Sequence, residues 1–319
     1  MEFRSLGKSD IKISPIIMGT WQAGKSMWTG IDDTETTKAI QAAFEAGITT
    51  FDTAEVYGNG HSERIVGEAL IDVRKNAVYA TKVFPNHLFH DQLIEACNRS
   101  LKNLKTDYID LYQIHWPAGS WGSKIVPIEE TMGAMNELKE KGKIRAIGVS
   151  NFSGTQIQDA AEYGQIDSLQ PPYSLFWRHV EKDAMPYCIE NNITILAYSS
   201  MAQGILTGRY GFDHSFVKGD HRRKNKLFKP ENFVRVQEAL SRLRPIAEKY
   251  GISLGNLALA WVMAQPGTCA IAGARSAEQV LENAKAVEIN LSSEDFLEMD
   301  AIGRTVTDNL DDDPVMWEF

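Results

Sequence analysis

Residues 128–149 read IEETMGAMNELKEKGKIRAIGV, an amphipathic segment followed by a short, mostly apolar one. Residues 128–141 repeat their apolar side chains at helical spacing, which predicts a helix. Residues 144–149 are mostly apolar, as are the strands of a parallel sheet that helices cover on both faces. A similar apolar run, residues 108–114, precedes this pair, and a further amphipathic segment, 153–162, follows it. Strands that alternate with helices in this way indicate a parallel sheet.

The alternation extends along almost the whole chain, after a predicted hairpin in residues 2–15. Eight runs read as strands, and nearly all of them are followed by an amphipathic helix. These runs are residues 16–19, 49–51, 77–81, 108–114, 144–149, 168–170, 193–198 and 269–273. Eight repeated units without a break in composition favour a closed (β/α)8 TIM barrel over an open sheet. We therefore expect residues 1–319 to form one α/β barrel domain with an N-terminal hairpin and extra helices.

Composition excludes several kinds of partner. The chain of 319 residues carries a net charge of −9, whereas nucleic acids and anionic membranes attract basic surfaces. Its three cysteines lie far apart, so they predict neither a disulfide framework nor a zinc site. No apolar run suits a signal peptide or a membrane span. We expect a cytoplasmic protein that acts on a small molecule, and the sequence leaves its oligomeric state open.

The ends of the predicted strands carry a set of polar side chains. In β/α barrels, active residues lie at the carboxyl ends of strands and in the loops that follow. Asp52, Lys82 and His115 end the second, third and fourth strands, and Tyr57 lies in the loop after the second. A carbonyl that accepts hydride needs a proton donor, and the Tyr57 phenol suits that role once a nearby ammonium lowers its pKa. Lys82 would supply that ammonium, Asp52 would hold it charged and oriented, and His115 would donate a hydrogen bond to the substrate oxygen.

Four segments together resemble those of the aldo-keto reductases. They are FDTAEVYG at 51–58, ATK at 80–82, DYIDLYQIHW at 107–116 and GVSNF at 148–152. The similarity covers essentially the whole chain and is greatest to the bacterial subgroup that contains the general-stress and inositol-utilisation reductases. It implies a (β/α)8 barrel, NADPH as cofactor, reduction of aldehydes or ketones to alcohols, and the catalytic roles just given.

The resemblance also implies a cofactor site that is spread over several loops. Ser150, Asn151 and Gln170 match the side chains that hold the nicotinamide carboxamide, and Tyr198 matches the ring that stacks on the nicotinamide. The implied cofactor residues are Gly19, Thr20, Trp21, Asp52, Ser150, Asn151, Gln170, Tyr198, Ser199, Ser200, Met201, Ala202, Gln203, Gly204, Leu206, Gly208, Arg209, Gly273, Ala274, Arg275, Gln279 and Asn283. The family often has Pro-Leu where this chain has Ser200 and Met201.

Arg275 decides the expected cofactor. A guanidinium matches a 2′-phosphate bidentately. The turn that contains Arg275 holds no Asp or Glu to receive a free 2′-hydroxyl, as sites for NAD often do. We therefore expect NADPH, and the alternative is a surface arginine that caps the preceding strand.

Two segments leave alternatives open. A long polar stretch, residues 208–229, carries His-Arg-Arg-Lys at 221–224 and is either a lid over an anionic cofactor or a solvated run of charge. The acidic C-terminal tail, residues 311–319 with Trp317 and Phe319, is either free or docked near the pocket.

The predicted substrate pocket is aromatic. Trp21, Trp28, Phe84, Trp116 and Trp177 fall at or near strand ends, where the alternative is packing in the barrel rim. A regulatory barrel that binds NADPH and senses redox state, as in the related potassium-channel β subunits, is the alternative function, but the complete catalytic set argues against it. A metal-dependent hydrolase would need clustered ligands such as His-x-His, and the seven histidines include no such pair.

Overall fold

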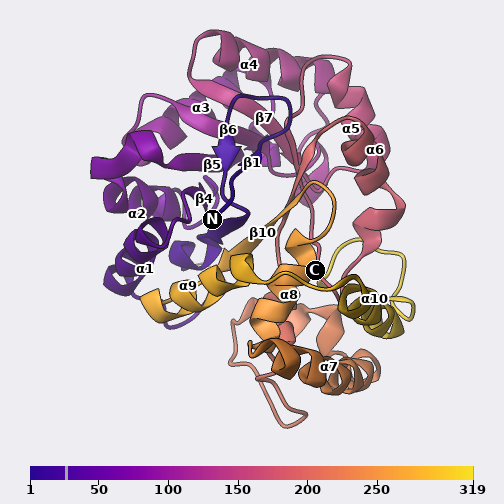
Figure 1. The fold of residues 1–319 in the computed structure, drawn as a ribbon. Helices are drawn as coiled ribbons and strands as arrows, with labels where there is room; N and C mark the ends of the chain where they lie inside the picture. The colour runs from indigo at the N-terminus through magenta and orange to yellow at the C-terminus, as the bar shows by residue number, and fades with distance from the viewer. Residues whose placement is uncertain (26–27, 319) are drawn as a thin grey trace.

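The computed structural model describes residues 1–25 and 28–318, and its centre is a barrel of parallel strands surrounded by helices (Figure 1). The strands are β3 Ile16–Gly19, β4 Thr50–Asp52, β5 Val78–Val83, β6 Ile109–Ile114, β7 Ile144–Ser150, β8 Ser168–Gln170, β9 Thr194–Ala197 and β10 Thr268–Gly273. They close in the order β10-β3-β4-β5-β6-β7-β8-β9. The predicted (β/α)8 architecture is therefore confirmed. Phe319 of the predicted tail lies outside the described residues.

Helices cover the outside of the barrel, as the amphipathic segments predicted. They are α1 Asp33–Glu45, α2 His61–Ala69, α3 His90–Asn103, α4 Ile128–Glu140, α5 Gly154–Ala161, α6 Ala184–Glu190, α7 Pro230–Tyr250, α8 Leu254–Met263, α9 Ala277–Ala284 and α10 Ser293–Thr307. Side-chain caps fix several helix starts: Ser153 Oγ accepts from the Gln156 amide at α5, and Ser276 Oγ accepts from the Gln279 amide at α9. In the described part of the chain, no helix combines the length and the apolar character that a bilayer crossing requires.

The two ends of the barrel interior differ in polarity. The hairpin, β1 Arg4–Ser5 and β2 Lys12–Ile13, places Leu6 and Ile13 in one buried cluster with Ala80 and Leu111. Because side chains alternate along a strand, the residues two positions after Ala80 and Leu111 point to the same face. These are Lys82 and Gln113, and both are fully buried. Apolar side chains therefore fill the end near the hairpin, and polar ones collect at the other end, which we call the mouth.

The polar stretch after β9 folds back on the protein. It forms 3-10 turns at His221–Lys224 and Lys226–Phe228, in which Arg222 and Lys226 are buried. A solvated run of charge does not account for these buried cations, because a cation that loses its hydration needs a partner within the protein. The tail after α10 returns to this stretch, and Trp317 pairs with Asn225 in an antiparallel bridge.

Candidate active site

A buried ion pair lies at the mouth, between the ends of β4 and β5. Lys82 Nζ lies 2.7 Å from Asp52 Oδ1 and donates a second hydrogen bond of 2.8 Å to the Thr53 carbonyl. The exposed fractions of Lys82 and Asp52 are 0% and 4%. A charge this deep is tolerated only when it is paired and hydrogen-bonded, so the pairing predicted for these two residues is present in the structure.

Two glutamines complete the surroundings of Asp52. Gln170 Nε2 donates to Asp52 Oδ2 at 2.8 Å, Gln113 Nε2 lies 3.5 Å from the same oxygen, and the two amides contact each other at 3.3 Å. Gln170 was predicted as a holder of the cofactor amide, and here one of its donors is already used by the carboxylate. Gln113 was not predicted, although its place two residues before His115 puts it on the inner face of β6.

Tyr57 and His115 meet beside this ion pair. Their ring centroids lie 5.7 Å apart in an edge-to-face arrangement, and Lys82 Nζ lies 5.1 Å from the Tyr57 ring centroid. The loop that carries Tyr57 depends on Gly58, whose φ is +62° and where a Cβ atom would lie 2.4 Å from the Gly24 carbonyl oxygen. Only glycine fits so close an approach in that conformation. The structure thus brings the four predicted catalytic side chains together.

Burial sets their protonation states. The pKa of Tyr57 is raised well above its usual range, because its hydroxyl is buried and the negative charge of Asp52 opposes ionisation. The Tyr57 residue as a whole keeps partial exposure to solvent. Burial also lowers the pKa of Lys82, and burial followed by the charge of Lys82 lowers the pKa of His115 well below its usual range. The prediction that Lys82 lowers the pKa of Tyr57 is wrong for this structure, because burial and the negative charge of Asp52 raise that pKa instead.

A hydrogen-bonded chain links β7 to β9 across the mouth. The Tyr198 hydroxyl donates to Asn151 Oδ1 at 2.8 Å, and Asn151 Nδ2 donates to the His115 carbonyl and to Ser150 Oγ, each at 3.0 Å. Ser150 Oγ in turn donates to the Gln170 carbonyl at 2.7 Å. Asn151 has a φ of +60°, a conformation that asparagine tolerates better than most residues. Tyr198 is therefore held by the same network that fixes the backbone at His115.

The predicted cofactor residues at β3 and β10 lie side by side. Gly19 and Gly273 are paired in the barrel, and Gln22 Nε2 joins their loops by donating to the Gly19 carbonyl at 3.1 Å and the Ala274 carbonyl at 2.7 Å. Thr20 is buried, and its hydroxyl donates to the Asp52 carbonyl at 2.9 Å. The Thr20 side chain therefore positions β4 and is fully occupied by the protein.

The loop after β9 has an unusual backbone. Ser199, Ala202 and Gln203 have φ values of 54°, 48° and 55°, and Gly204 has 95°. Non-glycine residues in this region cost free energy and are concentrated in functional loops. Ser200 Oγ is bound to the carbonyls of the barrel, which makes it structural. Of the other residues predicted here, Leu206 is packed in the core, while Met201 is only partly buried and Gly208 ends the 3-10 turn with φ of 71°.

Arginines surround a hollow of about 360 Å³ next to this loop. Arg209, Arg222 and Arg275 line it. Arg222 is paired with both oxygens of Asp220, at 2.9 Å and 2.5 Å, whereas Arg275 Nη2 is buried and makes no hydrogen bond in the described structure. Burial, followed by repulsion from the other two arginines, lowers the pKa of Arg275. An anion placed here would relieve that repulsion.

The neighbours of Arg275 include two more predicted cofactor residues. Gln279 Oε1 accepts from the Arg275 amide at 2.9 Å and so fixes the turn, and Asn283 lies one helical turn further along α9, partly exposed.

Aromatic side chains line the mouth. Trp21 contacts Trp28 and Tyr57, with ring centroids 5.2 Å and 6.3 Å away, and Phe84 lies 5.8 Å from the His115 ring. Trp116 is adjacent, 5.7 Å from the half-exposed Trp121. Trp121 was not predicted, because it lies in a loop without any periodic pattern. His221 and Trp317 also reach this region, from the polar stretch and from the tail that the sequence left either free or docked near the pocket.

The prediction that Trp177 lines the substrate pocket needs correction. Its side chain is fully buried, its indole N–H donates to the Pro314 carbonyl at 3.0 Å, and its ring lies 4.7 Å from that of His179. The tail covers Trp177, so this residue packs in the core under the tail and does not face the mouth.

Several buried polar atoms near the mouth have no hydrogen-bond partner among the described residues. Their chemistry can be compared with that of a dinucleotide. They are Trp28 Nε1, His115 Nδ1, Gln203 Nε2, His221 Nε2, Arg275 Nη2 and Trp317 Nε1, none of which makes a hydrogen bond within the described residues. Four of these atoms can only donate. Buried donors are nearly always satisfied in folded proteins, so this surplus fits a ligand rich in acceptors. The phosphates and carboxamide of a nicotinamide dinucleotide are acceptors of this kind.

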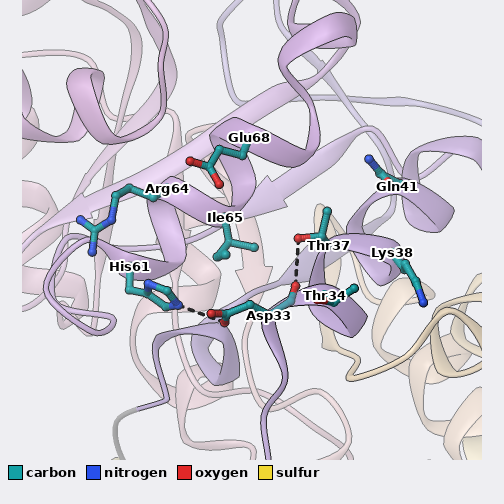
Figure 2. A pocket seen from close by; sticks show the side chains of 9 residues that line it. All are labelled: Asp33, Thr34, Thr37, Lys38, Gln41, His61, Arg64, Ile65 and Glu68. Atoms are coloured by element: carbon teal, nitrogen blue, oxygen red, sulfur yellow. Dashed lines mark hydrogen bonds and ion pairs between the residues drawn. The ribbon is translucent and has the colours of Figure 1, made fainter.

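A larger hollow, of about 630 Å³, lies elsewhere, on the outer layer between α1 and α2 (Figure 2). It is open and lined by polar and charged side chains, and His61 Nε2 lies 3.0 Å from Asp33 Oδ1 within it. None of the predicted site residues lines this groove. Its size therefore does not identify it as the active site, because the chemically competent groups lie at the mouth.

Comparison with known proteins agrees with this geometry. Residues 15–304 match the model of the Aldo/keto reductase family. The chain belongs to the aldo/keto reductase family. The resemblance inferred from its motifs is thus confirmed, and the protein is an oxidoreductase related to enzymes that act on carbonyl compounds.

Individual relatives cover nearly the full length. Aldo-keto reductase YhdN of Bacillus subtilis is 39% identical over 331 residues, which span 100% of this chain and 97% of that protein. The NADH-specific methylglyoxal reductase of Escherichia coli is 36% identical, with 91% of this chain and 94% of that protein covered. The crystal structure of an aldo-keto reductase from Klebsiella pneumoniae in complex with NADPH has a TM-score of 0.75 at 29% identity and covers 99% of this chain and 100% of that one. The family thus uses nicotinamide cofactors, and its members differ in which one.

Proposed function

We propose that this aldo/keto reductase reduces small aldehydes or ketones to alcohols with NADPH and that Tyr57 is the proton donor. One observation carries the proposal: the Tyr57 and His115 rings lie 5.7 Å apart beside the buried pair of Lys82 and Asp52. This set offers an acid, a hydrogen-bond donor and a buried ammonium held by a carboxylate at one place. Such groups are what a carbonyl oxygen needs as negative charge develops on it.

A nicotinamide bound against Tyr198 would supply the hydride that the carbonyl carbon accepts. The Tyr57 hydroxyl gives its proton to the carbonyl oxygen, so that its own O–H bond breaks as the O–H bond of the alcohol forms. Lys82 stabilises the negative charge left on Tyr57, and Asp52 keeps Lys82 protonated in its buried position. His115, held neutral by burial, donates a hydrogen bond to the same oxygen. Proton donation by a positioned side chain contributes about 10²–10⁴-fold to a rate.

The preference for NADPH rests on the arginines at the end of the site. Arg222 is neutralised by Asp220, whereas Arg275 has a buried, unbonded Nη2 and lies among like charges. A 2′-phosphate would satisfy that donor and compensate the charge, whereas a 2′-hydroxyl could accept the hydrogen bond but would leave the charge uncompensated. Charge-assisted bidentate contacts of this type are among the stronger hydrogen bonds in proteins.

The substrate is proposed to be uncharged. Trp21 lies 6.3 Å from the Tyr57 ring and Phe84 lies 5.8 Å from the His115 ring. Trp121 extends this wall by contacting both Phe84 and Trp116. At the catalytic centre, the charges of Lys82 and Asp52 neutralise each other. An aromatic wall without a compensating charge favours apolar or aromatic aldehydes over charged ones.

We further propose that residues 1–319 act as one domain, because the hairpin and the tail both pack on the barrel. The three cysteines are buried and free, which suits the reducing cytoplasm that the sequence predicted.

Kinetics of NADPH oxidation across a panel of aldehydes, with NADH as the control cofactor, test the proposal. We expect aldehyde-dependent oxidation and a kcat/KM for NADPH at least about tenfold above that for NADH, given one additional charge-assisted contact. A preference for NADH would contradict the cofactor assignment. Absence of aldehyde-dependent oxidation of either cofactor would contradict the proposed activity as a whole.

A further inference from the structure

The tail joins the basic segment, residues 220–229, through the backbone. The Lys226 amide donates to the Met316 carbonyl and the Glu318 amide donates to the Lys224 carbonyl, each at 2.9 Å. Asn225 lies opposite Trp317 in the antiparallel bridge between these bonds. The paired residues are 90 or more positions apart in the chain, so each segment holds the other in place.

Ion pairs reinforce this contact. Lys226 Nζ lies 3.0 Å from Asp311 Oδ1 and 2.7 Å from Asp313 Oδ2, and Lys229 Nζ lies 2.6 Å from Glu318 Oε1. Lys226 is buried while both aspartates are exposed. The acidic tail thus compensates a cation that the basic segment buries.

Trp317 connects the tail to the mouth. It is 7% exposed, and its ring centroid lies 6.3 Å from that of Tyr198 and 5.2 Å from that of His221. His221 in turn lies 5.4 Å from Trp21. The four rings form a continuous chain from the proposed nicotinamide-stacking residue on one side of the mouth to the first βα loop on the other.

We propose that residues 311–318 are a latch that holds the basic segment closed over the cofactor site, with Trp317 as the positioning residue between Tyr198 and His221. This inference rests on the proposed function, because it assigns the latch to the nicotinamide cofactor. When the latch is closed, His221 and Trp317 cover the space between Tyr198 and Trp21. The cofactor then leaves only after two sets of contacts break. They are the backbone hydrogen bonds between residues 224–226 and the tail, and the ion pairs of Lys226. The latch therefore sets the rate of cofactor release without taking part in proton transfer.

The first test compares Trp317→Ala with the conservative Trp317→Phe in the full chain. Release of NADPH is measured by stopped-flow fluorescence after displacement with excess NADP⁺. We expect Trp317→Ala to release NADPH about tenfold faster and to raise the KM for NADPH by a similar factor, because two ring contacts are lost. Trp317→Phe retains an aromatic ring and should stay within about threefold of the wild type. Single-turnover kinetics at saturating NADPH measure the chemical step, whose rate should change far less in Trp317→Ala than the rate of NADPH release does.

The second test addresses the ion pairs with a matched control. Asp311→Asn with Asp313→Asn removes both partners of Lys226, whereas Asp312→Asn makes the same kind of change at the exposed residue between them. The double variant should release NADPH faster at low salt and lose most of the acceleration that salt produces in the wild type. Asp312→Asn should behave as the wild type. These exposed substitutions preserve the test if Trp317→Ala fails to fold.

The outcomes separate the latch from the proposed function. If the wild type oxidises NADPH with aldehydes but Trp317→Ala and the double aspartate variant release the cofactor at the wild-type rate, the latch is overturned and the proposed function stands. If Trp317→Phe releases NADPH as fast as Trp317→Ala does, the aromatic contacts of residue 317 do not hold the latch closed, and the inference is likewise overturned. If the wild type does not bind NADPH at all, the proposed function fails instead.

Discussion

Lys82 Nζ lies 2.7 Å from Asp52 Oδ1 because of the register between β4 and β5. In this register Asp52 lies opposite Ala80, and Lys82 follows Ala80 by two residues on the same inward face. The register of two strands therefore places a cation and an anion side by side in a region closed to solvent. Breaking such a pair leaves a buried, uncompensated charge, which costs about 3–5 kcal/mol. The pair is therefore expected to affect stability as well as the proposed catalysis.

Removal of either partner should destabilise the fold. Lys82→Met and Asp52→Asn should each lower the free energy of unfolding, Lys82→Met by about 3–5 kcal/mol because the buried Asp52 carboxylate loses its partner. The double variant should lose less than the sum of the two single losses, because no charge remains unpaired. Denaturant titration measures all three. Strictly additive losses would show that the two side chains do not act as a pair.

Arg275 should determine the choice between the two cofactors. In Arg275→Leu, we expect the ratio of kcat/KM for NADPH to that for NADH to fall by about 10- to 100-fold, because charge-assisted hydrogen bonds to the 2′-phosphate are lost. Arg223→Leu removes an equal charge from an exposed position of the basic segment and serves as the control. Equal ratios in the wild type and Arg275→Leu would exclude a 2′-phosphate contact at this residue.

The pH dependence of reduction follows from the raised pKa of Tyr57. The acid must be protonated to act, and a pKa above its usual value keeps it protonated through the neutral range. The kcat/KM for the aldehyde should therefore stay flat between about pH 7 and pH 9 and fall only at higher pH, as the phenol ionises. A decline that begins near neutrality would show that the charge of Lys82 dominates in the loaded enzyme.

The low pKa of His115 makes a prediction about stability. Burial keeps the folded pKa below that of the unfolded chain, so the unfolded state binds the proton first as the pH falls. The free energy of unfolding should therefore decrease as the pH is lowered below about 6.5. In His115→Asn this part of the slope should disappear, as measured by urea titrations at a series of pH values. An unchanged slope would mean that His115 is solvated in the folded state.

Trp121 should contribute to substrate choice. It is half exposed, lies 6.2 Å from Phe84 and 5.7 Å from Trp116, and has a φ of +58°. Trp121→Ala should raise the KM for aromatic aldehydes by about tenfold, because stacking area is lost, and should change the KM for small aliphatic aldehydes far less. Ile125→Ala, at an 84% exposed position of the same loop, is the control. Equal effects on both substrate classes would argue against a wall at Trp121.

The sequence predicted the barrel and the catalytic set because both depend on short-range rules. Alternation along a strand determines which residues point inward, so Asp52, Lys82 and His115 could be assigned to the mouth from strand ends alone. The same rule would have found Gln113. By contrast, Trp317 and His221 reach the mouth through the tail and the basic segment, whose positions depend on one another and not on a local pattern.

Electrostatics and burial were harder to predict than position. The sequence placed Lys82 near Tyr57 but did not show that Asp52 and burial together raise the pKa of the phenol. It likewise placed Trp177 near a strand end without showing that the tail covers it. Both outcomes depend on which side chains are packed above a residue, and that information is not local in the sequence.

Tyr57→Phe tests the central claim most directly, because it removes one oxygen and leaves the ring in place. Binding of NADPH, measured by fluorescence titration, should be unchanged within about twofold, while kcat for aldehyde reduction should fall by about 10²–10⁴-fold. Turnover close to that of the wild type, with binding intact, would contradict the role of Tyr57 as the proton donor.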